Sequence, residues 1–144
     1  MNVLSSLLYF IGEQIEDYRN AQSDVGTLKI ANGSGKSIAS GSTWVGMESD
    51  ASLELEQGSW IVTGTINYSA NANGCRGIRF YANNTSYTAT SMQVPAVSGL
   101  LTRLSSTLVL NVTAEAGTTC CLQAIQDSGS TIVTTSYLRA LRIK

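Results

Sequence analysis

Residues 59–69 read Ser-Trp-Ile-Val-Thr-Gly-Thr-Ile-Asn-Tyr-Ser, and their side chains alternate in character along the chain. One set of alternate positions holds Trp60, Val62, Gly64, Ile66 and Tyr68. The other set holds Ile61, Thr63, Thr65 and Asn67. Because successive side chains of a strand point to opposite faces, this pattern predicts a β-strand with one buried face. It is the clearest strand in the chain, and the fold class follows from it and its neighbours.

Shorter or weaker alternating stretches lie on both sides of this strand, separated by glycine- and asparagine-rich turns. The other predicted strands cover residues 37–47 (one or two strands), 53–56, 75–82, 87–94, 103–114, 118–126, 131–134 and 137–144. Residues 87–94 are polar and end at Pro95, which is typical of an edge strand. Eight or nine strands spaced by about 8–14 residues predict an antiparallel jelly-roll β-sandwich.

A different periodicity precedes the β region, between residues 4 and 25. Apolar residues recur there in steps of four and three, at Leu4, Leu8, Ile11, Ile15 and Tyr18, and the register continues through Gln22 to Val25. This heptad pattern predicts a helix that begins near Asn2, a plausible N-cap, and ends near Asn20 or Ser23. A lone helix cannot bury so narrow a stripe, and β-branched isoleucine at both core positions favours three strands.

We therefore expect Leu4, Leu8, Ile11, Ile15 and Tyr18 to form the trimer interface of a short coiled coil. The alternative is a single amphipathic helix packed on its own β-domain. The predicted organisation is a helical stalk at 1–25, a neck linker at 26–36 and a β head at 37–144. Within the neck, residues 27–30 fit either a short strand or an extended segment.

The composition restricts the classes of function. Charged residues make up 13% of the 144 residues and the net charge is −1, so a basic surface for nucleic acid is not expected. The chain has no histidine, which removes the commonest general base and neutral metal ligand. Cys75, Cys120 and Cys121 suit small packing residues of a reducing compartment better than a disulfide framework or a metal site.

We expect no catalytic residue, no metal and no cofactor. Glu54 and Glu56 share one face of a predicted strand, about 7 Å apart by strand rise. A carboxylate pair at such a distance is compatible with glycoside hydrolysis, but we expect both side chains to face solvent. Residues 3–11 are too short and too interrupted for an export signal or a membrane span, so we expect neither a signal peptide nor a membrane partner.

Three stretches resemble the head domains of phage tail fibres. Residues 56–64 (Glu-Gln-Gly-Ser-Trp-Ile-Val-Thr-Gly) are similar to the "paGtWlitG" strand of that family. Residues 126–130 (Gln-Asp-Ser-Gly-Ser) and 138–144 (Leu-Arg-Ala-Leu-Arg-Ile-Lys) resemble its closing hairpin and last strand. Residues 4–12 resemble the opening of such proteins. The resemblance covers about residues 1–12 and 37–144.

The resemblance implies a non-enzymatic homotrimer on a phage virion, made in the bacterial cytoplasm, whose head is similar to the jelly rolls of tumour necrosis factor and the complement globular heads. It implies receptor binding, with a cell-surface glycan or protein of the host as partner. Two alternatives stay open. One is a purely structural module of a baseplate or a capsid decoration. The other is a bacterial surface trimer of the complement-head type.

Carbohydrate sites combine an aromatic face with amide and hydroxyl groups. The loops at 68–76 and 81–87 offer these groups, and the candidate ligand-binding residues are Tyr68, Asn71, Asn73, Arg76, Tyr81, Asn83, Asn84 and Tyr87. The alternative is that they form ordinary solvated turns whose tyrosines cover the core.

The remaining aromatic and basic residues have simpler expectations. We expect Trp60 in the core or in a trimer contact, and Trp44 half-exposed at an interface. For Arg103, Arg139 and Arg142 we expect solvated side chains, with cross-strand or cross-protomer pairing to Glu54, Glu56 or Asp127 as the alternative.

Overall fold

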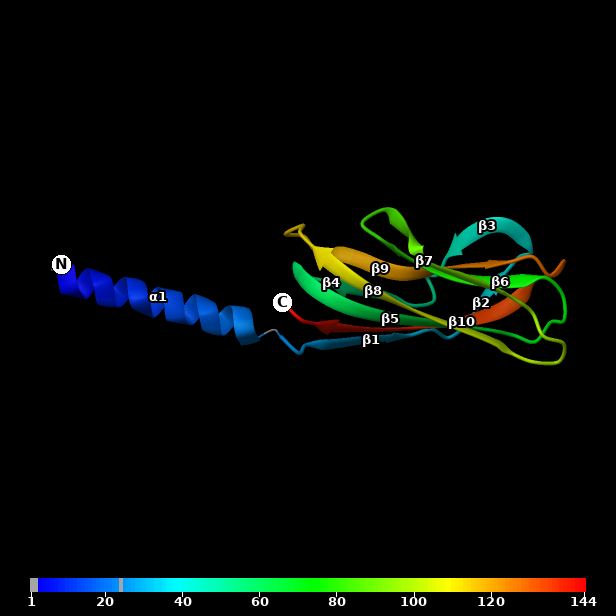
Figure 1. The fold of residues 1–144 in the computed structure, drawn as a ribbon, viewed down its shortest axis with the longest axis horizontal. Helices are drawn as coiled ribbons and strands as arrows, with labels where there is room; N and C mark the ends of the chain where they lie inside the picture. The colour runs from blue at the N-terminus through cyan, green and yellow to red at the C-terminus, as the bar shows by residue number, and fades with distance from the viewer. Residues whose placement is uncertain (1–2, 24) are drawn as a thin grey trace.

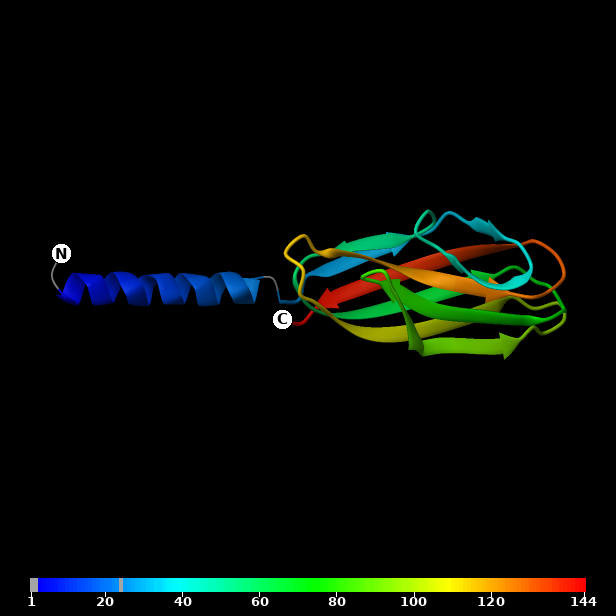
Figure 2. The same cartoon turned by 90° about the horizontal axis from the view of Figure 1, so that it is seen from above.

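The computed structural model describes residues 3–23 and 25–144, with side chains for 4–16 and 25–144. Helix α1 (Val3–Ser23) projects from one end of a two-layer β-sandwich, along the long axis of the molecule (Figure 1). The carboxyl terminus lies at this same end, which we call the stalk end, and the opposite end is the distal end (Figure 2). The alternative of a helix packed on its own β-domain is therefore wrong. The predicted N-cap Asn2 and the side chain of Tyr18 lie outside the described parts.

Ten strands follow the helix within the described residues. They are β1 (Leu28–Asn32), β2 (Lys36–Ile38), β3 (Gly41–Gly46), β4 (Ser52–Leu55), β5 (Gly58–Tyr68), β6 (Cys75–Ala82), β7 (Thr85–Pro95), β8 (Thr102–Val112), β9 (Thr118–Gln126) and β10 (Ile132–Arg142). Sheet A has the order β1-β10-β5-β8, with β2 also paired to β10. Sheet B has the order β3-β9-β6-β7, with β4 also paired to β9.

All the strand pairings are antiparallel, and the two sheets stack face to face. This arrangement confirms the predicted jelly-roll sandwich. Strand β7 ends the order of sheet B, as its polar sequence predicts. Among residues 3–23 and 25–144, no helix is both long enough and apolar enough to cross a bilayer.

The core forms where the apolar face of β5 meets sheet B. Trp60, Val62, Ile66 and Tyr68 are all 0% exposed, as the alternation in 59–69 predicts. The indole Nε1 of Trp60 donates a hydrogen bond of 3.0 Å to the carbonyl of Glu56, so the buried ring leaves no polar atom unpaired. Trp60 is thus a core residue of the single chain.

The segment predicted as a neck linker belongs to the sandwich. Strand β1 pairs with β10 from Leu28 opposite Leu141 to Asn32 opposite Tyr137. The backbone N–H of Gly26 also donates to the carbonyl of Arg142, at 2.8 Å. The sequence of residues 27–30 was compatible with either a strand or an extended neck. The pairing with β10 shows that this segment forms a strand. The β head therefore begins at about Leu28 rather than at residue 37.

Two polar contacts hold this edge of sheet A in place. Lys29 forms an ion pair with Glu56, and the hydrogen bond from Lys29 holds the pKa of Glu56 below its usual range. The carboxylate of Asp50 accepts hydrogen bonds of 2.7 Å from the backbone N–H groups of Gly35 and Ser136. The turn after β1 is thereby tied to β10.

The two strands predicted at 131–134 and 137–144 form one continuous strand, β10. It pairs with β1, β2 and β5, and these partners on both sides keep it extended. The turn before it is held by Gln126, which is 1% exposed. Its side-chain N–H groups donate to the carbonyls of Ile38 (2.9 Å) and Ser130 (2.8 Å), and its Oε1 accepts from the hydroxyl of Ser128 (2.6 Å).

The cysteines differ from one another in exposure. Cys120 and Cys121 are buried, at 0% and 1% exposed, and burial raises the pKa of Cys120 to about 12 and that of Cys121 still further. Cys75 is exposed at the start of β6, so the expectation that all three cysteines pack internally is wrong for this one. All three thiols are free.

Gly64 lies against Leu122 of the opposite sheet and yields a stability prediction. A Cβ at this position would lie 2.6 Å from Cδ2 of Leu122, which is itself 0% exposed. Gly64→Ala is expected to lower the free energy of unfolding by about 1–3 kcal/mol through overpacking. Chemical denaturation followed by tryptophan fluorescence measures this change.

Gly41→Ala is the matched control, because a Cβ on Gly41 has nothing within 4 Å. It is expected to leave stability unchanged or raise it slightly. Equal stabilities of the two variants would contradict the close sheet contact at Gly64.

Candidate functional site

Sheet A has one face in the core and one face that no other described segment covers; we call the second the open face. Its side chains come from four strands, because each strand alternates between core and open positions. They are Leu28, Ile30 and Asn32 of β1; Ser59, Ile61, Thr63, Thr65 and Asn67 of β5; Arg103, Ser105, Thr107, Val109 and Asn111 of β8; and Val133, Thr135, Tyr137, Arg139 and Leu141 of β10.

An apolar row crosses the open face near the stalk end. The strand registers place Leu28 opposite Leu141, Leu141 opposite Ile61, and Ile61 opposite Val109. Leu28, Leu141 and Val109 are 57%, 40% and 68% exposed. Four aligned apolar side chains in contact with water are the kind of surface that usually serves as an interface.

The helix carries a second uncovered apolar surface. Leu4, Leu8, Ile11 and Ile15, the described members of the predicted heptad seam, are between 44% and 65% exposed. Helix α1 precedes β1 in the chain and projects from the end of the sandwich where the apolar row lies (Figure 1). The single chain thus leaves a long apolar surface unburied.

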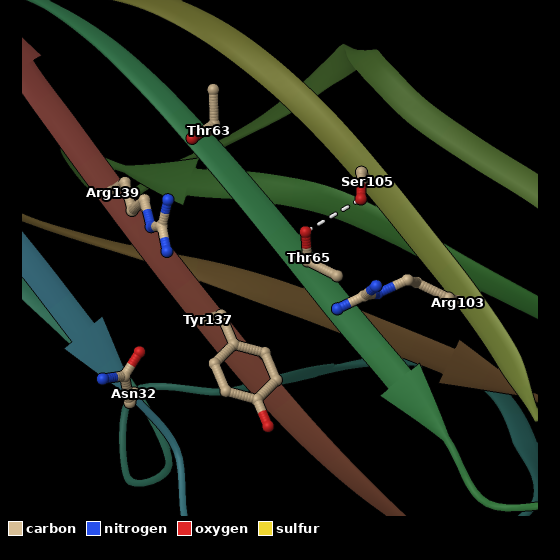
Figure 3. A pocket seen from close by; sticks show the side chains of 7 residues that line it. All are labelled: Asn32, Thr63, Thr65, Arg103, Ser105, Tyr137 and Arg139. Carbon is tan, nitrogen blue, oxygen red and sulfur yellow. Dashed lines mark hydrogen bonds between the residues drawn. The ribbon is translucent and has the colours of Figure 1, made fainter.

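A pocket of about 790 Å³ lies in the middle of the open face. It is lined by Asn32, Thr63, Thr65, Arg103, Ser105, Tyr137 and Arg139. Figure 3 shows Arg103 and Arg139 entering it from opposite sides, with Thr65 and Ser105 hydrogen-bonded between β5 and β8 at 2.8 Å. Sequence reasoning missed this pocket, because only strand order brings β1, β10, β5 and β8 side by side.

The charges on the open face are all of one sign. Arg103 and Arg139 are its only charged residues, and neither an aspartate nor a glutamate belongs to it. Nε of Arg103 donates to the side-chain oxygen of Asn67 at 3.0 Å, and Arg139 is exposed, with no hydrogen bond to another described residue.

Arg142 donates to the carbonyl of Gln57 at 2.6 Å. Pairing of Arg103 or Arg139 with Glu54, Glu56 or Asp127 does not occur in the described part of the single chain.

The eight predicted ligand-binding residues do not come together. Asn71 and Asn73 lie in the loop 69–74 at the distal end, whereas the turn at Asn83 and Asn84 lies at the stalk end of β6. The eight residues of β6 separate the two loops by about 25 Å at the usual strand rise. Tyr81 and Tyr87 are half-buried near the stalk-end turn.

Two of the eight residues are buried beneath the distal end. The hydroxyl of Tyr68 donates to the carbonyl of Gly77, and burial raises the pKa of this tyrosine far above its usual range. Arg76 is 0% exposed and donates to the carbonyls of Cys75 (2.9 Å) and Asn71 (3.4 Å). Its Nε has no partner among the described residues. Tyr68 is thus tied to β6 and Arg76 to the distal loop, and neither side chain is on the surface.

The stalk-end turn borders a second pocket, of about 670 Å³, on sheet B. Tyr81, Asn83 and Asn84 line it together with Glu48 and Glu54. Glu54 and Glu56 are both exposed, as expected, and Glu54 accepts a hydrogen bond of 2.7 Å from the hydroxyl of Thr119. Glu56 is engaged by Lys29, so the two carboxylates do not form an acid–base pair.

A third pocket, of about 310 Å³, lies on sheet B at the distal end and contains Trp44, Gln93 and Asp127. The guanidinium carbon of Arg79 lies 4.4 Å from the centroid of the half-buried Trp44 ring, and Nε of Arg79 donates to Gln123 at 2.6 Å. The sequence pointed to Trp44 as half-exposed. It could not reveal Gln93 as a neighbour, because β7 reaches β3 only across β6 and β9.

Comparisons with known proteins identify the fold. No family model and no curated protein matches this chain. Among solved structures, it is similar to Eiger TNF from S. frugiperda (TM-score 0.52, 9% identity, 81% of this chain and 93% of that chain). It is also similar to the globular domain of zebrafish complement 1qA protein (TM-score 0.52, 9% identity, 80% and 97%).

A third similar structure is that of infectious bursal disease virus, Gt strain (TM-score 0.54, 13% identity). The match covers 83% of this chain but only 34% of the viral chain, so this chain corresponds to about a third of it. At such low identity the three likenesses establish a shared jelly-roll fold.

The turn at Asn83 and Asn84 gives a prediction that separates backbone geometry from ligand binding. Both residues have positive φ, 52° and 54°, which asparagine and glycine tolerate best. Asn84→Gly is expected to leave stability within about 0.5 kcal/mol of the parent, whereas Asn84→Val costs about 1–2 kcal/mol. Thermal unfolding measures both. Equal stability of the valine variant would show that the turn does not require the left-handed conformation.

Proposed function

We propose that this protein is a non-enzymatic, homotrimeric structural protein of the phage fibre-head type that attaches to a bacterial surface. The observation that carries the proposal is the exposure of two apolar surfaces, the helix seam and the apolar row of the open face. Burying one leucine or isoleucine side chain contributes about 1.5–3 kcal/mol, and association of identical chains through these surfaces would remove several such side chains from water.

The proposed trimer has two contacts. In the stalk, Leu4, Leu8, Ile11, Ile15 and Tyr18 form the core of a three-stranded coiled coil. In the head, the apolar row of Leu28, Leu141, Ile61 and Val109 packs against the neighbouring copies. The resemblance to fibre heads, which implies a homotrimer, and β-branched isoleucine at both core positions of the seam support three copies rather than two. The viral structure with the same fold, and the resemblance to fibre heads, support a place on a virion.

Two pairs of substitutions in the full chain test the assembly. Ile11→Asp with Ile15→Asp removes core side chains from the stalk, and Val109→Asp with Leu141→Asp places charges in the apolar row. Each pair is expected to raise the concentration at which the trimer dissociates by at least about tenfold. Light scattering of diluted samples measures the mass.

Val97→Asp is the control, because Val97 is 56% exposed but lies in the loop 96–101 at the distal end. It is expected to leave the mass unchanged. A parent chain that is monomeric at micromolar concentration, or both pairs remaining trimeric, would refute the proposed assembly.

The distal end is the part of the head left free to meet a receptor, since the stalk occupies the other end. The Trp44 pocket there combines a half-buried indole with the amide of Gln93, a hydroxyl from Ser42 and the carboxylate of Asp127. These groups suit a saccharide, which stacks on an aromatic ring and hydrogen-bonds to polar neighbours. Asn71 and Asn73, in the adjacent loop 69–74, extend the same polar surface.

Receptor binding is tested with the parent trimer on an array of bacterial surface glycans and on whole cells. Trp44→Ala is expected to reduce binding at least about tenfold, the scale of losing one aromatic contact. Glu115→Ala is the control, because Glu115 is exposed in the turn between β8 and β9, away from the Trp44 pocket, and it is expected to retain binding. If the parent chain binds neither glycans nor cells, receptor binding is refuted and one of the two alternatives applies. These are a purely structural virion module and a bacterial surface trimer of the complement-head type.

A further inference from the structure

The open face presents an electrostatic problem for the proposed trimer. Its charged side chains are two arginines, and it contributes no carboxylate. If three copies pack through this face, six guanidinium groups gather between the heads. Removing a charge from water without a partner costs several kcal/mol, so assembly needs negative charge from elsewhere. This argument rests on the proposed function, because it requires the open faces to meet.

The pocket between the two arginines is arranged to receive such a charge. Nε of Arg103 is oriented by its 3.0 Å hydrogen bond to Asn67, which leaves the terminal nitrogens of the guanidinium free to donate. Arg139 enters from the other side, with no hydrogen bond to another described residue (Figure 3). The remaining lining consists of hydroxyls and one amide, from Asn32, Thr63, Thr65, Ser105 and Tyr137.

We propose that this pocket binds a small multivalent oxyanion of the phosphate, sulfate or tricarboxylate class, which bridges Arg103 and Arg139 and allows the heads to associate. Guanidinium groups bind oxyanions through pairs of parallel N–H donors. The hydroxyls and the amide satisfy the remaining oxygens. The attraction strengthens when neighbouring copies exclude water from the pocket, because the effective dielectric constant falls.

The size and the position of the pocket favour a small anion over a polymer. A volume of about 790 Å³ accommodates a phosphate or citrate together with water. A polyphosphate chain of the bacterial cell wall would have to pass between packed heads to reach it. The carboxylates on the other sheet, Glu48 and Glu54, line a pocket on the opposite face of the same head and do not reach Arg103 or Arg139.

The experiment measures the mass of the full-length chain on dilution, by light scattering, in sodium chloride and in sodium phosphate at equal ionic strength. Phosphate is expected to lower the concentration at which the trimer dissociates at least about tenfold relative to chloride. Arg103→Gln with Arg139→Gln is expected to abolish this difference and to give a trimer in chloride as stable as the parent in phosphate. Lys144→Gln removes a charge outside the pocket and is expected to keep the phosphate response.

The outcomes separate the proposal from the proposed function. A trimer equally stable in chloride and phosphate overturns the anion site and leaves the trimer intact. A monomer in both buffers overturns the proposed function itself. A third arm adds poly(glycerol phosphate) to the parent trimer. Arginine-dependent binding of this polymer without any change in trimer stability would show an open receptor pocket, and would also overturn the bridging anion.

Discussion

The constraint on which the structure depends is the two-residue period of β5 at the contact between the sheets. Trp60, Val62, Ile66 and Tyr68 fill the space between the sheets, and Gly64 admits Leu122 from the opposite sheet. Because side chains alternate along a strand, burying this set forces Ile61, Thr63, Thr65 and Asn67 outward. The open face of sheet A is therefore a direct consequence of how the core packs. The same alternation of buried and outward side chains occurs in β1, β8 and β10.

The two outer faces of the sandwich differ in chemistry, and the proposed function gives each face a different role. The open face of sheet A combines an apolar row near the stalk with a pocket whose charges are both positive. Sheet B carries two pockets with carboxylates, one near the stalk and one beside Trp44 at the distal end. Assembly through the first face would leave the second exposed, so contacts between copies and contacts with a receptor need not compete.

Several sequence features that suggest a binding site have structural explanations. Asn83 and Asn84 occupy left-handed positions of a tight turn, which accounts for the residue type without a ligand. Tyr68 and Arg76 are buried, the first bonded to Gly77 of β6 and the second to Asn71 of the distal loop. The Gln-Asp-Ser-Gly-Ser stretch that resembles the fibre-head hairpin encodes a turn in which Gln126 satisfies two carbonyls and a serine hydroxyl. The motifs behind the resemblance thus describe geometry more than chemistry.

The sequence by itself determined the elements and their buried faces, because hydrophobic periodicity is local: the helix, the core face of β5, the edge strand β7 and the jelly-roll class were all accessible. It could not determine that residues 28–32 join the sheet or that 131–134 and 137–144 are one strand, because both depend on partners distant in the chain. The candidate sites depended still more on tertiary structure. Arg103 and Arg139 are 36 residues apart and line one pocket only because β5 lies between β8 and β10. The distance between two loops is set by the strand that joins them, which is why β6 separated the predicted ligand residues.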